Sequence, residues 1–206
     1  MLRRFLSLTL TSLISLAASS QQSPTGAALP TPEEFLDSVV ATVVPGSFEH
    51  YYLVAGTDSC RFLKYSYDEW FKYALKEPLA FNILNELSEK VYLSRYPYFW
   101  KQPHLQKAIL ITRKQADSIT SSQIGYPRNA SKRFIRKWRR HLKHLPAWQH
   151  YVYSFSLPQF TDDGQFAVID LNFICGVACG EGFTCIYRLT TTGKWILVGR
   201  YTNWSS

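Results

Sequence analysis

Residues Phe166–Tyr201 read FAVIDLNFICGVACGEGFTCIYRLTTTGKWILVGRY, and this stretch decides the fold class. Three runs rich in β-branched and aromatic residues are separated by a Gly/Cys loop at Cys175–Gly182 and by a turn at Thr191–Lys194. Such punctuation is typical of an antiparallel meander. A fourth run, Tyr151–Leu157, precedes these strands and is separated from them by the turn Asp162-Asp163-Gly164. The pattern therefore predicts four antiparallel strands.

Helical patterns lie ahead of these strands, so the order of elements predicts an α+β domain over residues 31–206. We expect helices packed on one face of a curved four-stranded antiparallel meander. Capping residues and apolar spacing predict four helices: one that Thr31 caps, one over Tyr67–Lys76 that Ser66 caps, one from Pro78 through Val91, and one that Ser131 caps and Pro146 ends. Shorter strands are expected at Phe48–Ala55 and Ala108–Thr112, and a polar loop at Ser118–Arg128.

The N-terminus has the three regions of a secretory signal. Two arginines are followed by an apolar run at 5–16 and by small residues at 17–20. The apolar run is shorter than the ~20 residues that a membrane-spanning helix needs, which disfavours an anchor. We expect a signal peptide at 1–20, cleavage near Gln21, a flexible tether at 21–30, and an exported chain, periplasmic or extracellular, without a transmembrane segment.

The positive charge is concentrated in one helix. Removing residues 1–20 takes away Arg3 and Arg4 and no acid, so the net charge falls from +8 to +6. The segment 132–143 has no acid and carries seven cations: Lys132, Arg133, Arg136, Lys137, Arg139, Arg140 and Lys143. These are the candidate residues for binding an anionic envelope component by charge, without specific recognition of nucleic acid. The preferred interpretation of this charge is a solvated face on a helix whose apolar residues, including Phe134, Ile135 and Trp138, dock onto the sheet.

Four cysteines in an exported chain favour disulfides. If Cys175–Gly182 is the hairpin loop, Ile174 faces Phe183, and Cys185 lies too far along the ladder to reach Cys175. Cys175 with Cys179 is then the economical pair. A zinc site is disfavoured because the spacing Cys-x3-Cys-x5-Cys has no histidine nearby. The loop glycines lack the Lys-Ser/Thr of a phosphate-binding loop, so no metal and no cofactor is expected.

No motif assigns catalysis. The five histidines supply no evident base for a cysteine nucleophile, and His141 with His144 lacks a third metal ligand. Asp170 and Glu181 could act as an acid/base pair at the rim of the sheet. The leading interpretation is a non-catalytic binding or envelope protein. The alternatives are a hydrolase that uses these carboxylates near the Cys/Gly loop and an anion-binding protein that uses the helix 131–145.

The C-terminal third resembles a family of exported bacterial proteins of unknown function. The resemblance spans about residues 131–206 and rests on Leu145-Pro146, the Cys-Gly-x-x-Cys-Gly-x-Gly loop from Cys175, Gly193-Lys194-Trp195 and Trp204-Ser205. It implies export and a Cys/Gly-rich β-hairpin, with no activity or catalytic residue to carry over. Cys60 and Cys185 depart from the family pattern, which suggests them as a second candidate disulfide pair.

Overall fold

The structure is a computed structural model, and it describes residues 29–58, 60, 79, 81–94, 98–101, 105–124, 131–175 and 179–205. The predicted signal peptide, the predicted tether up to residue 28 and the predicted helix Tyr67–Lys76 lie outside these residues. They therefore stay predictions.

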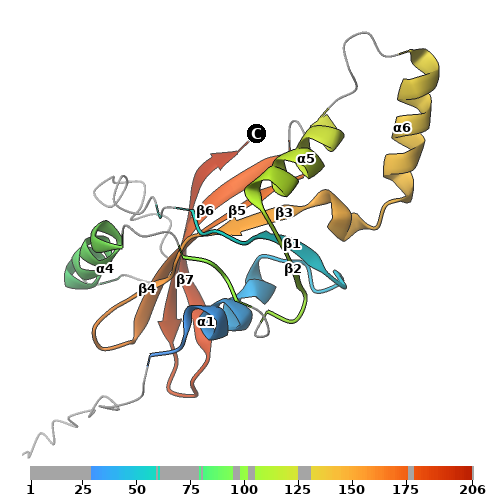
Figure 1. The fold of residues 1–206 in the computed structure, drawn as a ribbon. Helices are drawn as coiled ribbons and strands as arrows, with labels where there is room; N and C mark the ends of the chain where they lie inside the picture. The colour runs from blue at the N-terminus through green and yellow to red at the C-terminus, as the bar shows by residue number, and fades with distance from the viewer. Residues whose placement is uncertain are drawn as a thin grey trace, which may run out of the picture.

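The described strands form one mixed sheet of seven strands (Figure 1). The order across the sheet is β2-β1-β3-β5-β6-β7. The short strand β4 pairs with β5 along the same edge of β5 as β3. The strands are β1 (Tyr51–Val54), β2 (Ala108–Ile111), β3 (Val152–Phe155), β4 (Gln159–Phe160), β5 (Phe166–Ile174), β6 (Gly180–Leu189) and β7 (Trp195–Ser205).

The α+β class is confirmed, but the predicted four-stranded antiparallel meander is wrong. The strands β3, β5, β6 and β7 are antiparallel neighbours, yet β1 extends the sheet in parallel with β3, and β2 in parallel with β1. These parallel pairs join distant parts of the chain, because Tyr52 lies opposite Val152 and also opposite Ile109. Parallel pairing needs a long crossover and leaves no turn signal between the strands. Local sequence patterns therefore did not reveal it.

The predicted register of the β5–β6 hairpin is also wrong. Ile174 lies opposite Gly180, and Cys185 lies opposite Ile169. The hairpin is shifted because β6 begins at Gly180, so Gly180 and Gly182, which were assigned to the loop, belong to the ladder. The other predicted turns are confirmed at Gly164 and Gly193, whose φ angles of 66° and 76° suit glycine in tight turns.

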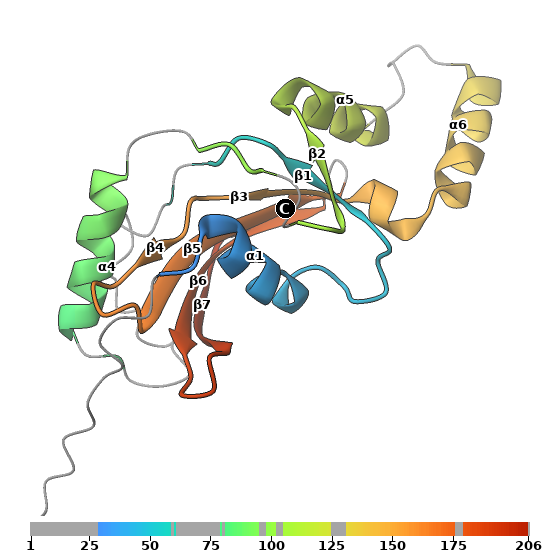
Figure 2. The ribbon, with the colours of Figure 1, turned by 60° about the horizontal axis from the view of Figure 1, so that its bottom comes forward.

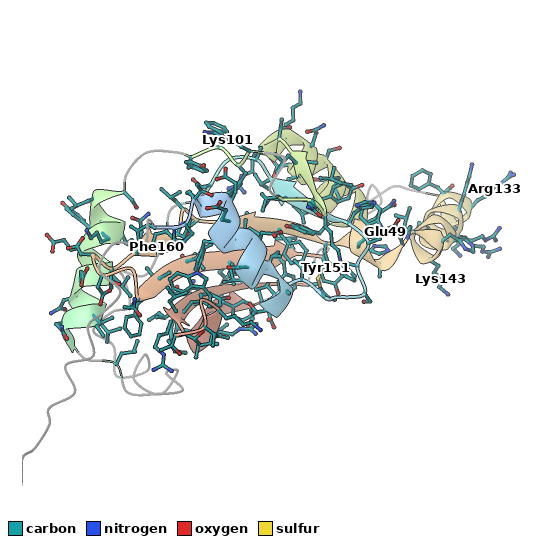
Figure 3. The ribbon with its side chains drawn as sticks, turned by 90° about the horizontal axis from the view of Figure 1, so that it is seen from below. Glu49, Lys101, Arg133, Lys143, Tyr151 and Phe160 are labelled. Atoms are coloured by element: carbon teal, nitrogen blue, oxygen red, sulfur yellow. A yellow bond between two sulfur atoms is a disulfide. The ribbon has the colours of Figure 1, made fainter. Side chains whose placement is uncertain are left out.

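One face of the sheet is covered by α1 (Pro32–Val39), and we call it the α1 face. A capping box begins α1: the Thr31 hydroxyl accepts from Glu34 N at 3.3 Å, and the Glu34 carboxylate accepts from Thr31 N at 2.8 Å. The buried Phe35 of α1 meets Tyr187 and Trp195 edge-on, with ring centroids 5.7 and 5.0 Å apart. Figure 3 looks onto this face, where α1 crosses the middle of the sheet. The short helix η1 (Val40–Thr42) continues α1.

The opposite face, called the α4/α5 face below, is covered at two places. Helix α4 (Phe81–Leu93) buries Leu87 and Val91 against Val168 of β5, and α5 (Arg113–Ile124) packs Ala116 with Val152 of β3. Successive strand residues point to opposite faces, so Val168 and Val152 lie opposite to the α1 core. The prediction that the helices share one face is therefore wrong. The loop predicted at Ser118–Arg128 is also wrong as far as 124, because α5 continues through it.

Helix α6 (Lys132–His144) lies apart from the sheet. Figures 1 and 2 both place it beyond the end of β3, joined to that strand through the short helix η2 (Ala147–His150). Its sequence forms the predicted helix, and the Ser131 hydroxyl accepts from Phe134 N at 3.2 Å, as an N-cap does. The fold thus presents α6 as a projecting element.

Candidate anion-binding site

The predicted basic residues lie together on α6. The side chains of Lys132, Arg133, Arg136, Lys137, Arg140 and Lys143 are exposed, while the side chain of Arg139 lies outside the described part. In Figure 3, Arg133 and Lys143 lie at the outer margin of the molecule, away from the strands. The structure therefore brings the candidate cations into one exposed element.

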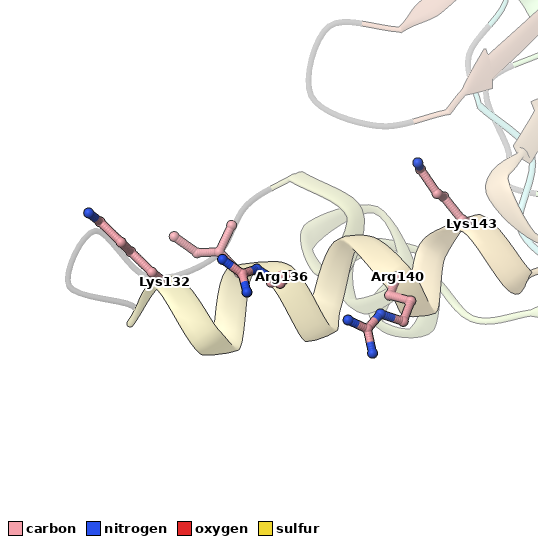
Figure 4. Close-up of a pocket in the computed structure, with 5 residues that line it drawn as sticks. Lys132, Arg136, Arg140 and Lys143 are labelled. Carbon is pink, nitrogen blue, oxygen red and sulfur yellow. The ribbon is translucent and has the colours of Figure 1, made fainter.

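Four of these cations border an open hollow along the helix (Figure 4). Its volume is about 470 Å³, and it is lined by Lys132, Ile135, Arg136, Arg140 and Lys143. Ile135 belongs to the apolar face that was predicted to dock onto the sheet, and the structure places it beside the cations instead. The hollow can accept an anionic group while Ile135 contacts an apolar part of the same partner.

The charges on α6 are not neutralised within the described part of the chain. The ion pairs found there involve His50, Lys90 and Arg113, and none of them reaches α6. Lys132, Arg136 and Arg140 follow one another at a spacing of four, where like charges destabilise a helix. Lys132 and Arg133 also occupy the first turn, where the positive end of the helix dipole disfavours cations. An anion bound here would relieve both kinds of repulsion.

The predicted burial of Phe134 against the sheet is wrong. Phe134, which should have been buried at that contact, is 49% exposed. The side chains of Trp138 and Leu142 lie outside the described part. Because α6 projects past β3 (Figure 2), its amphipathic pattern does not report packing on the sheet core. An amphipathic helix rich in Lys and Arg is also the pattern of helices that lie on charged surfaces.

The carboxylates Asp170 and Glu181 do not form a pair. Asp170 lies opposite Thr184 and points to the α4/α5 face, whereas Glu181 lies opposite Phe173 and points to the α1 face. Asp170 is buried, and its Oδ1 accepts from Thr184 Oγ1 at 2.6 Å and from Cys60 Sγ at 3.5 Å. These contacts depend on the fold, and no sequence spacing signalled them. The Asp170 carboxylate is therefore buried and accepts hydrogen bonds from the neutral side chains of Thr184 and Cys60.

Cys175 and Cys179 form a disulfide, with Cα atoms 5.0 Å apart, and Cys175 N donates to Cys179 O at 2.7 Å. The bridge closes the β5–β6 connection. Cys60 and Cys185 are not bridged, so the second candidate pair is wrong. Cys185 belongs to the core on the α1 face, and Cys60 packs against the core on the α4/α5 face. The sheet itself separates the two thiols.

Within the described residues, no helix is long and apolar enough to span a membrane, and no group of three or more His, Cys, Asp or Glu side chains is placed to hold a metal ion. No family model, no curated protein and no solved structure matches the chain. A functional proposal therefore depends on the geometry of the site.

Proposed function

We propose that the protein is an exported, non-catalytic binding protein that attaches to an anionic envelope or extracellular surface through α6. The observation that carries the proposal is the exposed row of cations, without ion-pair partners in the described residues, on a helix that projects from the sheet. A surface rich in phosphate, sulfate or carboxylate groups would release counterions and relieve repulsion along α6. Asp170 and Glu181 point to opposite faces of the sheet, so this pair does not support the hydrolase alternative.

The test measures binding of the mature chain to immobilised heparin and to phosphatidylglycerol–phosphatidylcholine vesicles as salt is raised. We expect binding that weakens steeply with salt, because exposed charges are screened over about 8 Å at physiological ionic strength. The variant Arg136→Gln with Arg140→Gln keeps good helix formers and removes two cations. At roughly 1 kcal/mol for each cation near an anionic surface, it should bind about thirtyfold more weakly.

The matched control is Lys114→Gln with Lys194→Gln. Both lysines are exposed and lie on α5 and in the β6–β7 turn, so this variant loses the same charge elsewhere. It should retain most of the binding. Wild-type protein that binds neither surface at low salt, or an equal loss in the control, would exclude α6 as the binding element.

A further inference from the structure

A second cavity lies on the α1 face, away from α6. It has a volume of about 240 Å³ and is bordered by the end of α1, by η1, by the following loop and by β1. Its apolar wall contains Val40, Val44 and Phe48. A cavity of about 150 Å³ holds one benzene molecule. This cavity therefore has room for one aromatic ring with a short substituent.

The polar part of the wall contains Tyr51, whose side chain makes no hydrogen bond to any described residue. Tyr51 is only 2% exposed, and its backbone N–H is already used by Lys107 O at 3.0 Å. Tyr51 also lines the cavity, so a ligand there meets its side chain. A hydrogen bond from a ligand to this largely buried hydroxyl would therefore stabilise the complex.

Asp37 provides a negative charge at the same cavity. Asp37 and Tyr51 line the same cavity, and burial first, and then the Asp37 carboxylate, raise the pKa of the Tyr51 hydroxyl. Asp37 is exposed, and it forms no hydrogen bond or ion pair with a described side chain. Lys107 also borders the cavity, but no ion pair joins it to Asp37. The carboxylate is therefore available to a ligand.

We propose that this cavity binds a small aromatic amine. The ammonium group would donate to the Tyr51 hydroxyl oxygen and lie beside the Asp37 carboxylate, while the ring would contact Val40, Val44 and Phe48. A cation is favoured because Asp37 and Tyr51 both line the cavity, and a charge-assisted hydrogen bond to the carboxylate is stronger than a neutral one. The site does not depend on the function proposed for α6, since it uses none of that helix.

The wild-type protein can be tested with three probes of one shape: benzylamine, benzyl alcohol and benzoate. Binding is followed by titration in two-dimensional NMR spectra, with the Val40, Val44 and Tyr51 signals as reporters. Benzylamine should saturate these signals and bind about tenfold more tightly than benzyl alcohol, as a hydrogen bond to a charged group implies. Benzoate should be the weakest of the three. If no probe saturates, or if benzoate binds best, the proposal is wrong.

Three variants locate the site. Asp37→Asn should abolish the preference for benzylamine over benzyl alcohol, and Tyr51→Phe should weaken both probes. Ala41→Trp fills the cavity from an exposed wall position and should prevent binding. The control Glu89→Gln removes one exposed charge on α4 and should change nothing. Equal benzylamine affinity in wild type, Asp37→Asn and Ala41→Trp, all with native NMR spectra, would place binding elsewhere and overturn the proposal.

Discussion

Gly182 is a position where only a residue without a side chain fits. It lies in β6 opposite Asn172 of β5 and Trp204 of β7. The Trp204 indole N–H donates to Asn172 Oδ1 at 3.1 Å across the glycine, and an added Cβ would overlap both of these atoms. Gly182 was predicted to lie in the Cys175–Gly182 loop. Its actual role is to leave room for this hydrogen bond.

Gly182→Ala should therefore destabilise the protein. The methyl group displaces the Trp204 indole and breaks its hydrogen bond, which together should cost about 1–3 kcal/mol. The measurement is the free energy of unfolding in urea. Gly46→Ala is the control, because a Cβ there meets no atom within 4 Å, and its effect should stay within ~0.5 kcal/mol. Equal stability of the two variants would contradict the steric argument.

The helices α4 and α6 have similar lengths, but α4 packs against the core and α6 projects away from the sheet. Leu87 of α4 is completely buried, whereas Phe134 of α6 is 49% exposed. Leu87→Ala should lower the free energy of unfolding by about 2–5 kcal/mol, because it leaves a cavity in the core. Phe134→Ala should change it by less than ~0.5 kcal/mol. Urea denaturation measures both, and a large loss in Phe134→Ala would show that α6 docks on the sheet.

The sequence predicted the elements whose local patterns agree with their environment. The apolar spacing of α4 and the runs of β-branched and aromatic residues in β5 and β6 reported real burial. Helix α5 was missed because, among its described side chains, only Ala116 and Thr120 are buried, which leaves little apolar periodicity. A signal was present: Thr112 Oγ1 accepts from Gln115 N, and Gln115 Oε1 accepts from Thr112 N, as in a capping box.

The basic helix was predicted as a candidate site, but its position was not. An amphipathic pattern shows that one face of a helix is apolar, but it does not show what covers that face. The cavity at Tyr51 had no sequence signal, since Asp37 and Tyr51 are brought together only when α1 crosses the sheet. The sequence also did not show that Asp170 and Glu181 point to opposite faces. That depends on the register between β5 and β6, in which Gly180 and Gly182 are part of the ladder.

The core of the whole molecule is rich in tyrosine, and this has a consequence for its stability in alkali. Burial and the hydrogen bond to Glu33 raise the pKa of Tyr98 to about 12. Burial also raises the pKa values of Tyr51, Tyr153 and Tyr187. The unfolded chain releases these protons near pH 10. Above that pH the unfolded state binds fewer protons than the folded state, so stability must fall as pH rises.

The free energy of unfolding should therefore be unaffected by these tyrosines below pH 10 and should fall steeply between pH 10 and 12. Each tyrosine that stays protonated in the folded state contributes about 1.4 kcal/mol per pH unit to the slope. Tyr153 is 1% exposed and makes no side-chain hydrogen bond to a described residue. Tyr153→Phe should therefore change the free energy of unfolding little at pH 7. Between pH 10 and 12 it should reduce the fall in this free energy by about 1.4 kcal/mol per pH unit. Tyr92→Phe, at an exposed position on α4, is the control. Urea denaturation at a series of pH values measures the slopes, and equal slopes for wild type and Tyr153→Phe would show that Tyr153 titrates alike in both states.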